Sequence, residues 1–227
     1  MISIIIPTYN ESKTIDLTLS KLSKVIPQDC EVIVIDGFSN DNTQEIVKNF
    51  NHVKLFNCKK GRSVQMNFGA QKASKDFLLF LHADTILNSN CIEYLTKELK
   101  SNTIVWGWFS IKLNNNRVIY RFIEIFANLR ARLTGTPLGD HAIFVKKGIF
   151  DKIGGFPDIP LLEDLEFVRK LKCISRGKRI NTSVITSVRR FENSGILKTC
   201  IKMWMIRLLY YLGFSTQILV RFYDDSR

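Results

Sequence analysis

The segment Phe77-Leu78-Leu79-Phe80-Leu81-His82-Ala83-Asp84 is an apolar run that ends in a carboxylate. A run of this length, rich in Phe and Leu and closed by polar residues, predicts a strand buried on both faces of a sheet. Asp84 is then expected at the carboxyl end of that strand. Because ligands of open α/β sheets bind beyond the carboxyl ends of the strands, Asp84 is placed to meet a ligand or its metal. The alternative is a turn or helix-capping residue, since Asp is common where a strand stops.

The composition allows one domain and several kinds of partner. The chain has 227 residues, of which 45% are hydrophobic, and this is enough for one sizeable core. Its formal net charge of +12 suits nucleic acid, an anionic membrane surface or a phosphate-bearing small molecule, and does not choose among them. The five cysteines include no pair at metal-ligand spacing and indicate a reducing compartment.

The apolar segments favour a protein that does not span a membrane. None approaches the ~20 apolar residues of a spanning helix, and the run at residues 2–6 is too short for a signal peptide. We therefore expect a cytoplasmic location, with peripheral contact at the inner face of the membrane as the alternative.

Around the organising strand, the first half of the chain alternates strand and helix patterns. Strands are expected at 2–6, 31–36 and 53–56, and each is followed by apolar residues at helical spacing or by cap residues. Gly61 opens the helix that leads into residues 77–84. Four β-α units in succession predict a parallel sheet with right-handed crossovers.

Polar residues follow three of these four strands. Residues 7–11 (Pro-Thr-Tyr-Asn-Glu) follow the first, Asp36-Gly37 the second and Asp84 the fourth. Because the carboxyl ends of parallel strands meet at one edge of a sheet, these residues predict a shared site. Asp36 is placed to accept a hydrogen bond from a ribose hydroxyl or a base N–H, and the alternative is a turn-former beside Gly37.

The sequence has no glycine-rich phosphate cradle of the two common kinds. The diphosphate of a bound nucleotide would therefore need a divalent cation on Asp84 together with basic side chains. Arg62, at the start of a predicted helix, is the candidate among the basic residues, while Lys59 and Lys60 are expected to be solvated.

The second half predicts further elements and an unusual C-terminus. One or two strands are expected in 104–111, a basic amphipathic helix at 118–133 with Phe122, Ile125, Phe126 and Leu129 on its apolar side, a strand at 142–145, a helix entered through Glu163-Asp164, and an edge-like strand at 180–188. An apolar-basic helix over 196–212 follows. It can pack on the body, pair with a second copy, or lie on an anionic bilayer.

Taken together, these segments resemble the family-two nucleotide-sugar glycosyltransferases of GT-A fold. The resemblance covers nearly the whole chain and is carried by residues 4–11, 34–37 with Ser39 and Asp41, 61–62 with 65–67, 82–84, 139–144, 154–156 and 163–164. Within the family the chain is most similar to the short bacterial branch of radical-SAM/selenodomain-associated and arsenosugar-biosynthesis glycosyltransferases. The implied fold is α/β: a Rossmann-like, mixed but mainly parallel sheet flanked by helices, with a C-terminal amphipathic helical extension.

The resemblance also implies a reaction and a cofactor. It is the metal-dependent, inverting transfer of a sugar from a nucleoside-diphosphate sugar, with a UDP-sugar the expected donor, to an acceptor hydroxyl. The family's D-x-D metal motif appears here as His82-Ala83-Asp84, so Asp84 is the implied ligand of Mg²⁺ or Mn²⁺. His82 stands where the family has an acid, and it either hydrogen-bonds the donor or is packed at a strand end.

The Glu163-Asp164 pair has two interpretations. Acids in the first turn of a helix complement the helix dipole. In the family the pair supplies the general base, which implies that Asp164 accepts the acceptor's proton and that Glu163 orients the substrate or loops.

The remaining implied site residues fall into two groups. The nucleotide-sugar-binding group is Pro7, Thr8, Tyr9, Asn10, Glu11, Asp36, Gly37, Arg62, Asn67, His82, Ala83 and Asp84. The group expected to meet the acceptor or the donor sugar is Trp106, Trp108, Asp140, His141, Arg189 and Arg190. For the Trp pair, core packing is the alternative to a sugar platform.

We expect residues 1–192 to form the catalytic domain and residues 193–227 the helical extension. The nucleotide would bind to the half at 1–100, and the acceptor to the half at 101–192. A lipid-linked acceptor would suit membrane contact through the extension, whereas a homodimer would use it as an interface.

Three other functions remain open on the sequence. A nucleotidyltransferase on a similar sheet would need a glycine-rich basic loop in place of residues 7–11. A family member that binds donor without turnover is suggested by His82. An RNA-binding protein fits the charge and the interleaved aromatics, but the gathered carboxylates would repel a polyphosphate backbone.

Overall fold

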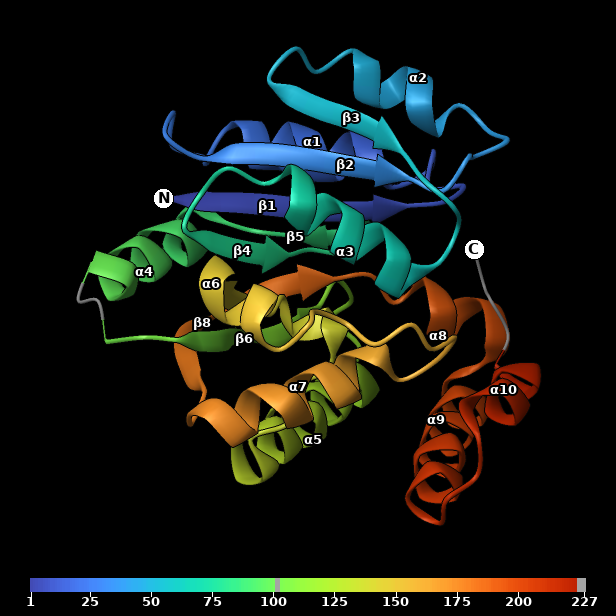
Figure 1. Ribbon diagram of the computed structural model, residues 1–227. Coiled ribbons are helices and arrows are strands. Elements are labelled where there is room, and N and C mark those ends of the chain that lie inside the picture. Colours follow the sequence, from blue (N-terminus) through green and yellow to red (C-terminus); the bar gives the residue numbers. More distant parts are fainter. Residues whose placement is uncertain (101–102, 224–227) are drawn as a thin grey trace.

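The computed structural model describes residues 1–100 and 103–223, so the parts of the predicted segments at 101–102 and 224–227 lie outside the described residues. Its described strands form one mixed sheet in the order β3-β2-β1-β4-β7-β6-β8-β5 (Figure 1). The predicted α/β class with helices on both faces is confirmed. The strands are β1 Ile2–Thr8, β2 Glu31–Asp36, β3 Val53–Asn57, β4 Phe77–Phe80, β5 Thr85–Ile86, β6 Trp106–Leu113, β7 Phe144–Lys146 and β8 Lys178–Thr186.

The first four strands pair in parallel, as the alternating pattern predicts, and β6 pairs in parallel with β8 in the second half. β1 pairs in parallel with both β2 and β4, and β2 pairs in parallel with β3. The register sets Thr8 of β1 opposite Asp36 of β2, so both strands end at the same edge. Helices connect these strands: α1 Ile15–Ser23, α2 Thr43–Lys48 and α3 Arg62–Lys72, with α4 Ser89–Lys100 after β5.

The central strands are buried on both faces because successive side chains point to opposite sides of a sheet. Ile4 and Ile6 belong to one core cluster, together with side chains of α1, α2 and α4. Ile5 belongs to a second cluster, together with side chains of α3 and the phenylalanines of the yellow and orange helices in Figure 1. Each apolar run in the sequence therefore contributes side chains to two hydrophobic cores, one on each face of the sheet.

The organising strand is shorter than its sequence predicts. β4 ends at Phe80, although the N–H of Leu81 still donates to the carbonyl of Ile5 at 3.0 Å. The chain then turns, with the N–H of Thr85 donating to the carbonyl of His82 at 3.1 Å, and enters the short β5. Asp84 therefore lies in the turn between two strands, four residues past the end of β4, and still at the carboxyl edge of the sheet.

The second half adds the antiparallel pairings. β7 pairs antiparallel with β4 and β6, and β5 pairs antiparallel with β8. The remaining helices are α5 Val118–Thr134, η1 Gly139–His141, α6 Lys147–Lys152, α7 Glu163–Ile174, α8 Arg189–Ser194, α9 Ile196–Tyr211, α10 Thr216–Leu219 and η2 Val220–Phe222. The predicted helix at the C-terminus is present as α9. Among the described residues, no helix combines the length and apolarity needed to cross a bilayer.

Replacing two helical glycines, Gly69 and Gly148, tests how tightly α3 packs on the sheet. A Cβ on Gly69 of α3 would lie 2.4 Å from Cγ2 of Ile5 and 3.1 Å from Cγ1 of Ile35, whereas a Cβ on Gly148 of α6 would meet nothing within 4 Å. We expect Gly69→Ala to lower the free energy of unfolding by about 1–3 kcal/mol, because overpacking displaces the helix. The matched Gly148→Ala should raise it by up to about 1 kcal/mol through helix propensity. Urea unfolding of both variants checks this, and equal effects would contradict the packing.

Candidate active site

A cavity of about 570 Å³ opens at the carboxyl edge of the sheet. Its volume lies in the range of ordinary ligand pockets, about 300–1,000 Å³. The lining comes from the ends of β1, β4 and β8, the first residues of α3 and α7, and the facing sides of α5 and α9. Five carboxylates and five guanidinium groups line it: Glu11, Asp84, Asp140, Glu163, Asp164, Arg62, Arg130, Arg189, Arg190 and Arg207.

Gly139 brings the turn after β4 and the start of α7 together. Its N–H donates to Oδ2 of Asp164 at 2.6 Å. A Cβ at this position would lie 2.7 Å from Nε2 of His82 and 3.4 Å from Oδ2 of Asp164. His82 and Asp164, the predicted base, thus lie on two sides of Gly139, where any side chain would contact both.

Asp164 is held at the N-terminus of α7 by the backbone. Leu162, the residue before the helix, has a left-handed conformation with φ of 63°, which is uncommon for a branched side chain and marks a constrained position. Besides Gly139, the Asp164 carboxylate accepts the N–H of Leu165 at 2.7 Å through Oδ1. Each oxygen keeps a further lone pair for another donor.

The buried Glu163 and the partly buried Arg62 form an ion pair beside Asp164. Nη1 of Arg62 lies 3.4 Å from Oε1 of Glu163. Burial raises the pKa of the Glu163 carboxyl and the Asp164 charge adds to this effect, while Arg62 opposes it. Burial lowers the pKa of the Arg62 guanidinium, but Glu163 and Tyr223 outweigh burial and raise it above its ordinary value. Arg62 therefore stays cationic in a cavity where a diphosphate would need it.

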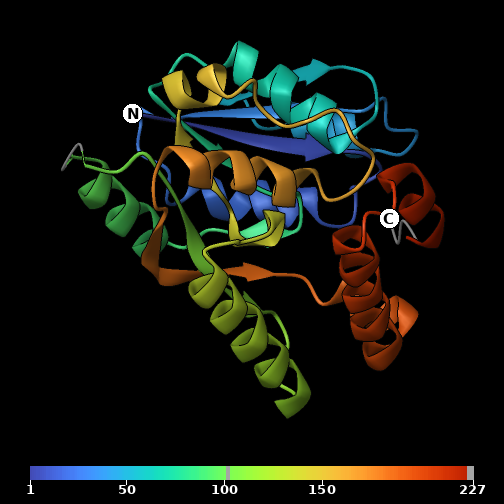
Figure 2. The ribbon, with the colours of Figure 1, turned by 60° about the horizontal axis from the view of Figure 1, so that its bottom comes forward.

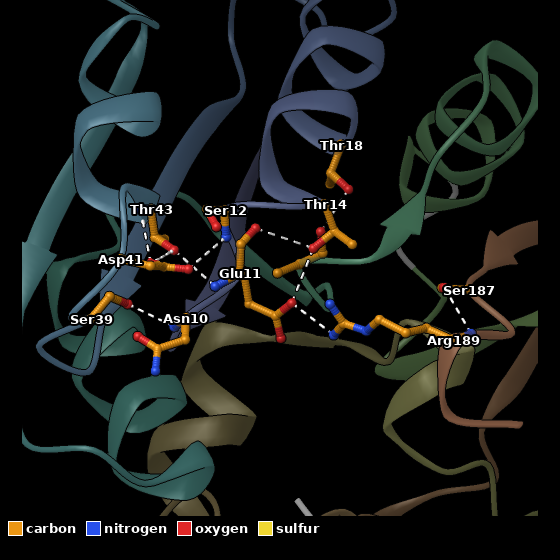
Figure 3. Close-up of polar contacts among 11 residues, drawn as sticks. Asn10, Glu11, Ser12, Thr14, Thr18, Ser39, Asp41, Thr43, Ser187 and Arg189 are labelled. Atoms are coloured by element: carbon orange, nitrogen blue, oxygen red, sulfur yellow. Dashed lines mark hydrogen bonds and ion pairs between the residues drawn. The ribbon is translucent and has the colours of Figure 1, made fainter. Parts of the chain in front are cut away.

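Glu11 joins the two ends of the chain within the cavity. Nη2 of Arg189 lies 2.9 Å from Oε2 of Glu11, across 178 positions of sequence (Figure 3). Thr14 donates to the same oxygen at 3.0 Å, and the Glu11 N–H donates to Oγ1 of Thr43 at 2.8 Å. This pair fixes the end of β1 against the segment that follows β8.

Asp36 does not line the cavity. Its side chain is fully buried, and its carboxylate accepts four hydrogen bonds: from Oγ1 of Thr8, the N–H and Oγ of Ser39, and Nε2 of Gln44, at 2.6–2.9 Å. Its observed contacts are therefore those of the turn-forming alternative. They hold the loop after β2 against β1.

Other residues of the predicted donor group also lie outside the cavity lining: Thr8, Tyr9, Asn10, Gly37 and Asn67. Nζ of Lys60 sits 3.8 Å from the ring centroid of Tyr9, so this lysine is not merely solvated. Asn67 exchanges two hydrogen bonds with the backbone of Phe156, at 2.8 and 2.9 Å. Pro7, Glu11, Arg62, His82, Ala83 and Asp84 do line it, which brings the first and fourth strand ends together as predicted.

The expectation of a sugar platform at Trp106 and Trp108 is wrong. Both side chains are core residues, with 1% and 4% of their surface exposed, and Nε1 of Trp106 donates to the carbonyl of Ser175 at 2.9 Å. Alternate residues of a strand share a face, and in β6 that face packs under α7. His141 is also fully buried and bonded to the carbonyl of Phe109 at 2.9 Å, so it does not face a ligand in the cavity. Of the acceptor group, Asp140, Arg189 and Arg190 line the cavity.

Two arginines and a tyrosine are among the lining residues that the sequence does not predict. Arg130 comes from α5 and Arg207 from α9. Tyr223 comes from the end of the described chain, where its hydroxyl accepts a hydrogen bond from Arg190. The ring centroid of Tyr223 lies 4.5 Å from Cζ of Arg190. No local motif marks these residues, and Arg207 and Tyr223 reach the cavity only because the C-terminal segment folds back against it.

The family model described as Glycosyl transferase family 2 matches residues 3–154, which is more than half of the chain. The chain belongs to glycosyl transferase family 2. This membership confirms the predicted family and enzyme class.

Curated relatives of this family-2 chain are similar to part of it. The UDP-Glc:alpha-D-GlcNAc-diphosphoundecaprenol beta-1,3-glucosyltransferase WfgD of Escherichia coli is 33% identical over 129 residues, covering 54% of this chain and 51% of the relative. A poly-beta-1,6-N-acetyl-D-glucosamine synthase of Staphylococcus epidermidis is 33% identical over 106 residues, covering 44% of this chain and 26% of the relative. The chain thus spans about half or less of these proteins.

Solved structures share the fold. The TarS fragment 1–349 of S. aureus in complex with UDP superposes with a TM-score of 0.69 at 23% identity, over 82% of this chain and 60% of that chain. The mannosyltransferase PcManGT of Pyrobaculum calidifontis, in complex with GDP-Man and Mn²⁺, gives a TM-score of 0.64 at 18% identity, over 91% and 64%. At such identities the likeness shows the fold alone, which is GT-A.

The family implies a divalent cation, and the cavity fits one that arrives with the donor. Among the described residues, no three His, Cys, Asp or Glu side chains gather as a metal-binding group. Mg²⁺ keeps several waters in such sites and binds through one or two carboxylates plus substrate phosphates. Asp84, one of the carboxylates in the lining, therefore fits a cation that arrives with the nucleotide.

Proposed function

We propose that this family-2 protein transfers a sugar, with inversion, from a nucleoside-diphosphate sugar to an acceptor hydroxyl. The observation that supports this best is that Asp84 and Asp164 line one cavity from different elements. The names of the relatives support a UDP-sugar as donor, since WfgD uses UDP-Glc and TarS is bound to UDP. The acceptor and the branch of the family are finer proposals. We keep the radical-SAM/selenodomain-associated and arsenosugar branch as a hypothesis.

The proposed chemistry divides between the two sides of the cavity. The oxygen of the acceptor hydroxyl attacks the anomeric carbon of the donor sugar, in line with the departing nucleoside diphosphate, and Asp164 accepts the proton of that hydroxyl. Arg62 and Arg189 are positioned to stabilise the charge that develops on the leaving group. A divalent cation on Asp84, when bound, neutralises charge on the donor diphosphate.

Glu163 is proposed to position Arg62 and not to accept the proton. Its carboxyl is buried and paired with Arg62 at 3.4 Å, so it is a weaker candidate for contact with an acceptor than Asp164. The same division makes residues 1–100 the donor half and residues 101–192 the half that receives the acceptor.

A thermal-shift panel of UDP-, GDP- and TDP-sugars with Mn²⁺ tests the donor proposal. At a donor concentration about 100 times Kd, binding stabilises the folded state by about 2.7 kcal/mol, which corresponds to a rise in Tm of about 5–10 °C for a chain of this size. We expect this rise with UDP-sugars. The absence of any shift with every sugar nucleotide, together with salt-dependent retention on RNA, would favour the RNA-binding alternative.

A further inference from the structure

The apolar side of α5 faces away from the core. The sequence predicts an amphipathic helix here, but its buried residues are Tyr120, Glu124 and Ala131. Among its exposed residues, Phe126 leaves 65% of its surface open and Leu133 leaves 75%. An amphipathic helix of a globular protein normally turns its apolar stripe to the core. In α5 that stripe is left without a partner among the described residues.

The helix α9 shows the same feature more strongly. It contains eleven large apolar or aromatic residues, yet only Thr199 and Ile206 are buried. Leu197 is 73% exposed, Trp204 is 62% exposed and Leu208 is 60% exposed. Large contiguous apolar patches on a protein surface mark interaction sites, whereas single exposed apolar residues need no explanation.

The two helices project to the same side of the molecule and flank the active-site cavity. In Figure 2, α5 (yellow-green) and α9 (red-orange) extend downward from the body as two separate helices. We call these two helices, Val118–Thr134 and Ile196–Tyr211, the prongs. Both contribute to the lining of the cavity that holds Asp164: Phe122 and Phe126 from α5, and Trp204 from α9. The apolar surface is therefore continuous with the cavity.

The charge of these helices is positive. Residues 196–222 contain Lys198, Lys202, Arg207 and Arg221 and no acid. In α5 the one acid, Glu124, is nearly buried and paired with Arg121 at 2.8 Å. Exposed apolar residues with Trp and interspersed Lys and Arg are typical of helices that lie in the interface of an anionic bilayer. A second copy of the same surface would instead bring like charges together.

Two arginines face the cavity between the prongs without a carboxylate partner in the described part of the chain. Nη1 of Arg130 donates to the carbonyl of Thr136 at 2.8 Å, and Nε of Arg207 donates to the carbonyl of Met203 at 3.1 Å. Burial lowers the pKa of Arg207 and the nearby charge of Arg130 lowers it further, while the charges of Asp140 and Asp164 oppose this without cancelling it. An anionic group between these guanidinium groups would relieve their repulsion.

We propose that α5 and α9 dock this protein on an anionic lipid bilayer, with the mouth of the cavity toward the membrane and Arg130 and Arg207 facing lipid phosphates. Docking holds the cavity against the bilayer surface. An acceptor hydroxyl carried on a lipid then reaches Asp164 without leaving the membrane. This second step rests on the proposed transfer reaction, whereas docking itself does not.

Vesicle co-sedimentation of the full chain tests the docking surface. The vesicles are phosphatidylcholine alone, or the same lipid with a third replaced by phosphatidylglycerol. The test variant carries Ile125→Ser, Leu133→Ser, Ile201→Ser and Leu208→Ser, which are exposed positions of the two prongs outside the cavity lining. The control carries Leu17→Ser, Phe38→Ser, Tyr94→Ser and Ile174→Ser, four exposed apolar positions away from α5 and α9.

We expect the wild type and the control to bind the anionic vesicles, and the prong variant to bind at least about tenfold more weakly. Raising the salt from about 0.1 M to about 1 M should weaken wild-type binding, because the Debye length falls from about 10 Å to about 3 Å. Equal binding of variant and control, or no binding of the wild type, would overturn docking. A dimer in sedimentation analysis that only the prong variant dissociates, without vesicle binding, would assign the surface to a second copy.

The two arginines have their own arm of the test. Arg130→Gln with Arg207→Gln should weaken binding to anionic vesicles about tenfold or more, and Lys21→Gln with Lys24→Gln, an equal loss of charge on and beside α1, should weaken it less. Equal losses of vesicle binding in the two double variants would show that Arg130 and Arg207 have no special part in the docking surface. If these variants abolish a thermal shift caused by inorganic phosphate alone while vesicle binding stays intact, Arg130 and Arg207 form a site for free phosphate.

Donor binding of the prong variant, measured in parallel by thermal shift, should be unchanged. If no variant and no wild type binds any sugar nucleotide, the proposed reaction fails while docking stands.

Discussion

Asp164→Asn is expected to lower turnover roughly 10²–10⁴-fold, the usual contribution of a positioned proton acceptor. The amide is nearly isosteric with the carboxylate and can still accept the N–H of Gly139, which lies 2.6 Å from Oδ2. It cannot accept a proton from an alcohol at neutral pH. The loss should therefore fall on kcat, with the affinity for the donor changed by no more than about twofold.

The measurement is the rate of donor consumption and transfer, with donor affinity determined separately by calorimetric titration. Asp158→Asn is the matched control, because it removes an exposed carboxylate a few residues before the same helix. An Asp164→Asn protein that turns over at a rate close to the wild type would take the general base away from this residue. Loss of donor binding instead of turnover would move Asp164 to the donor side of the cavity.

Asp84→Asn is expected to remove the metal dependence of donor binding. The wild type should bind a UDP-sugar at least about tenfold more tightly with Mn²⁺ than with a chelator, because a carboxylate and the diphosphate hold the ion together. The variant should bind with the same weaker affinity in both conditions. Mn²⁺ without nucleotide should bind neither protein tightly, since no group of three potential ligand side chains gathers among the described residues.

Calorimetry with and without Mn²⁺ decides this prediction. The control is Asp76→Asn, which removes an exposed carboxylate just before the opposite end of β4. If Asp84→Asn retained the full metal-dependent affinity, Asp84 would have no part in the donor site, whatever the motif suggests.

Much of the fold follows from local patterns. Side chains of the runs at 2–6, 31–36 and 77–80 alternate between two cores, so near-continuous apolar runs predict strands buried on both faces. Because parallel strands end at one edge, the sequence also predicts that the turn holding Asp84 lies beside the end of β1. These inferences succeed because burial and strand direction are properties of short segments.

Other features depend on contacts between distant segments and could not be predicted this way. Asp36 and Trp106 have the residue types of a binding site. The Asp36 carboxylate, however, already accepts four hydrogen bonds, from Thr8 and from the segment that follows β2, and Trp106 is covered by α7. The periodicity of α5 identifies an apolar face and leaves open what that face meets. Arg207 and Tyr223 reach the cavity only because the chain after β8 folds back to form part of its lining.

The proposed reaction requires one cavity to hold a cation-bridged sugar nucleotide between Asp84 and Asp164. Anomalous scattering from Mn²⁺, in crystals grown with Mn²⁺ and a UDP-sugar, tests this arrangement. We expect a manganese peak within about 2.0–2.6 Å of an Asp84 carboxylate oxygen. The sugar should then lie on the side of Asp164. A nucleotide bound elsewhere, or a manganese ion without contact to Asp84, would rule this arrangement out.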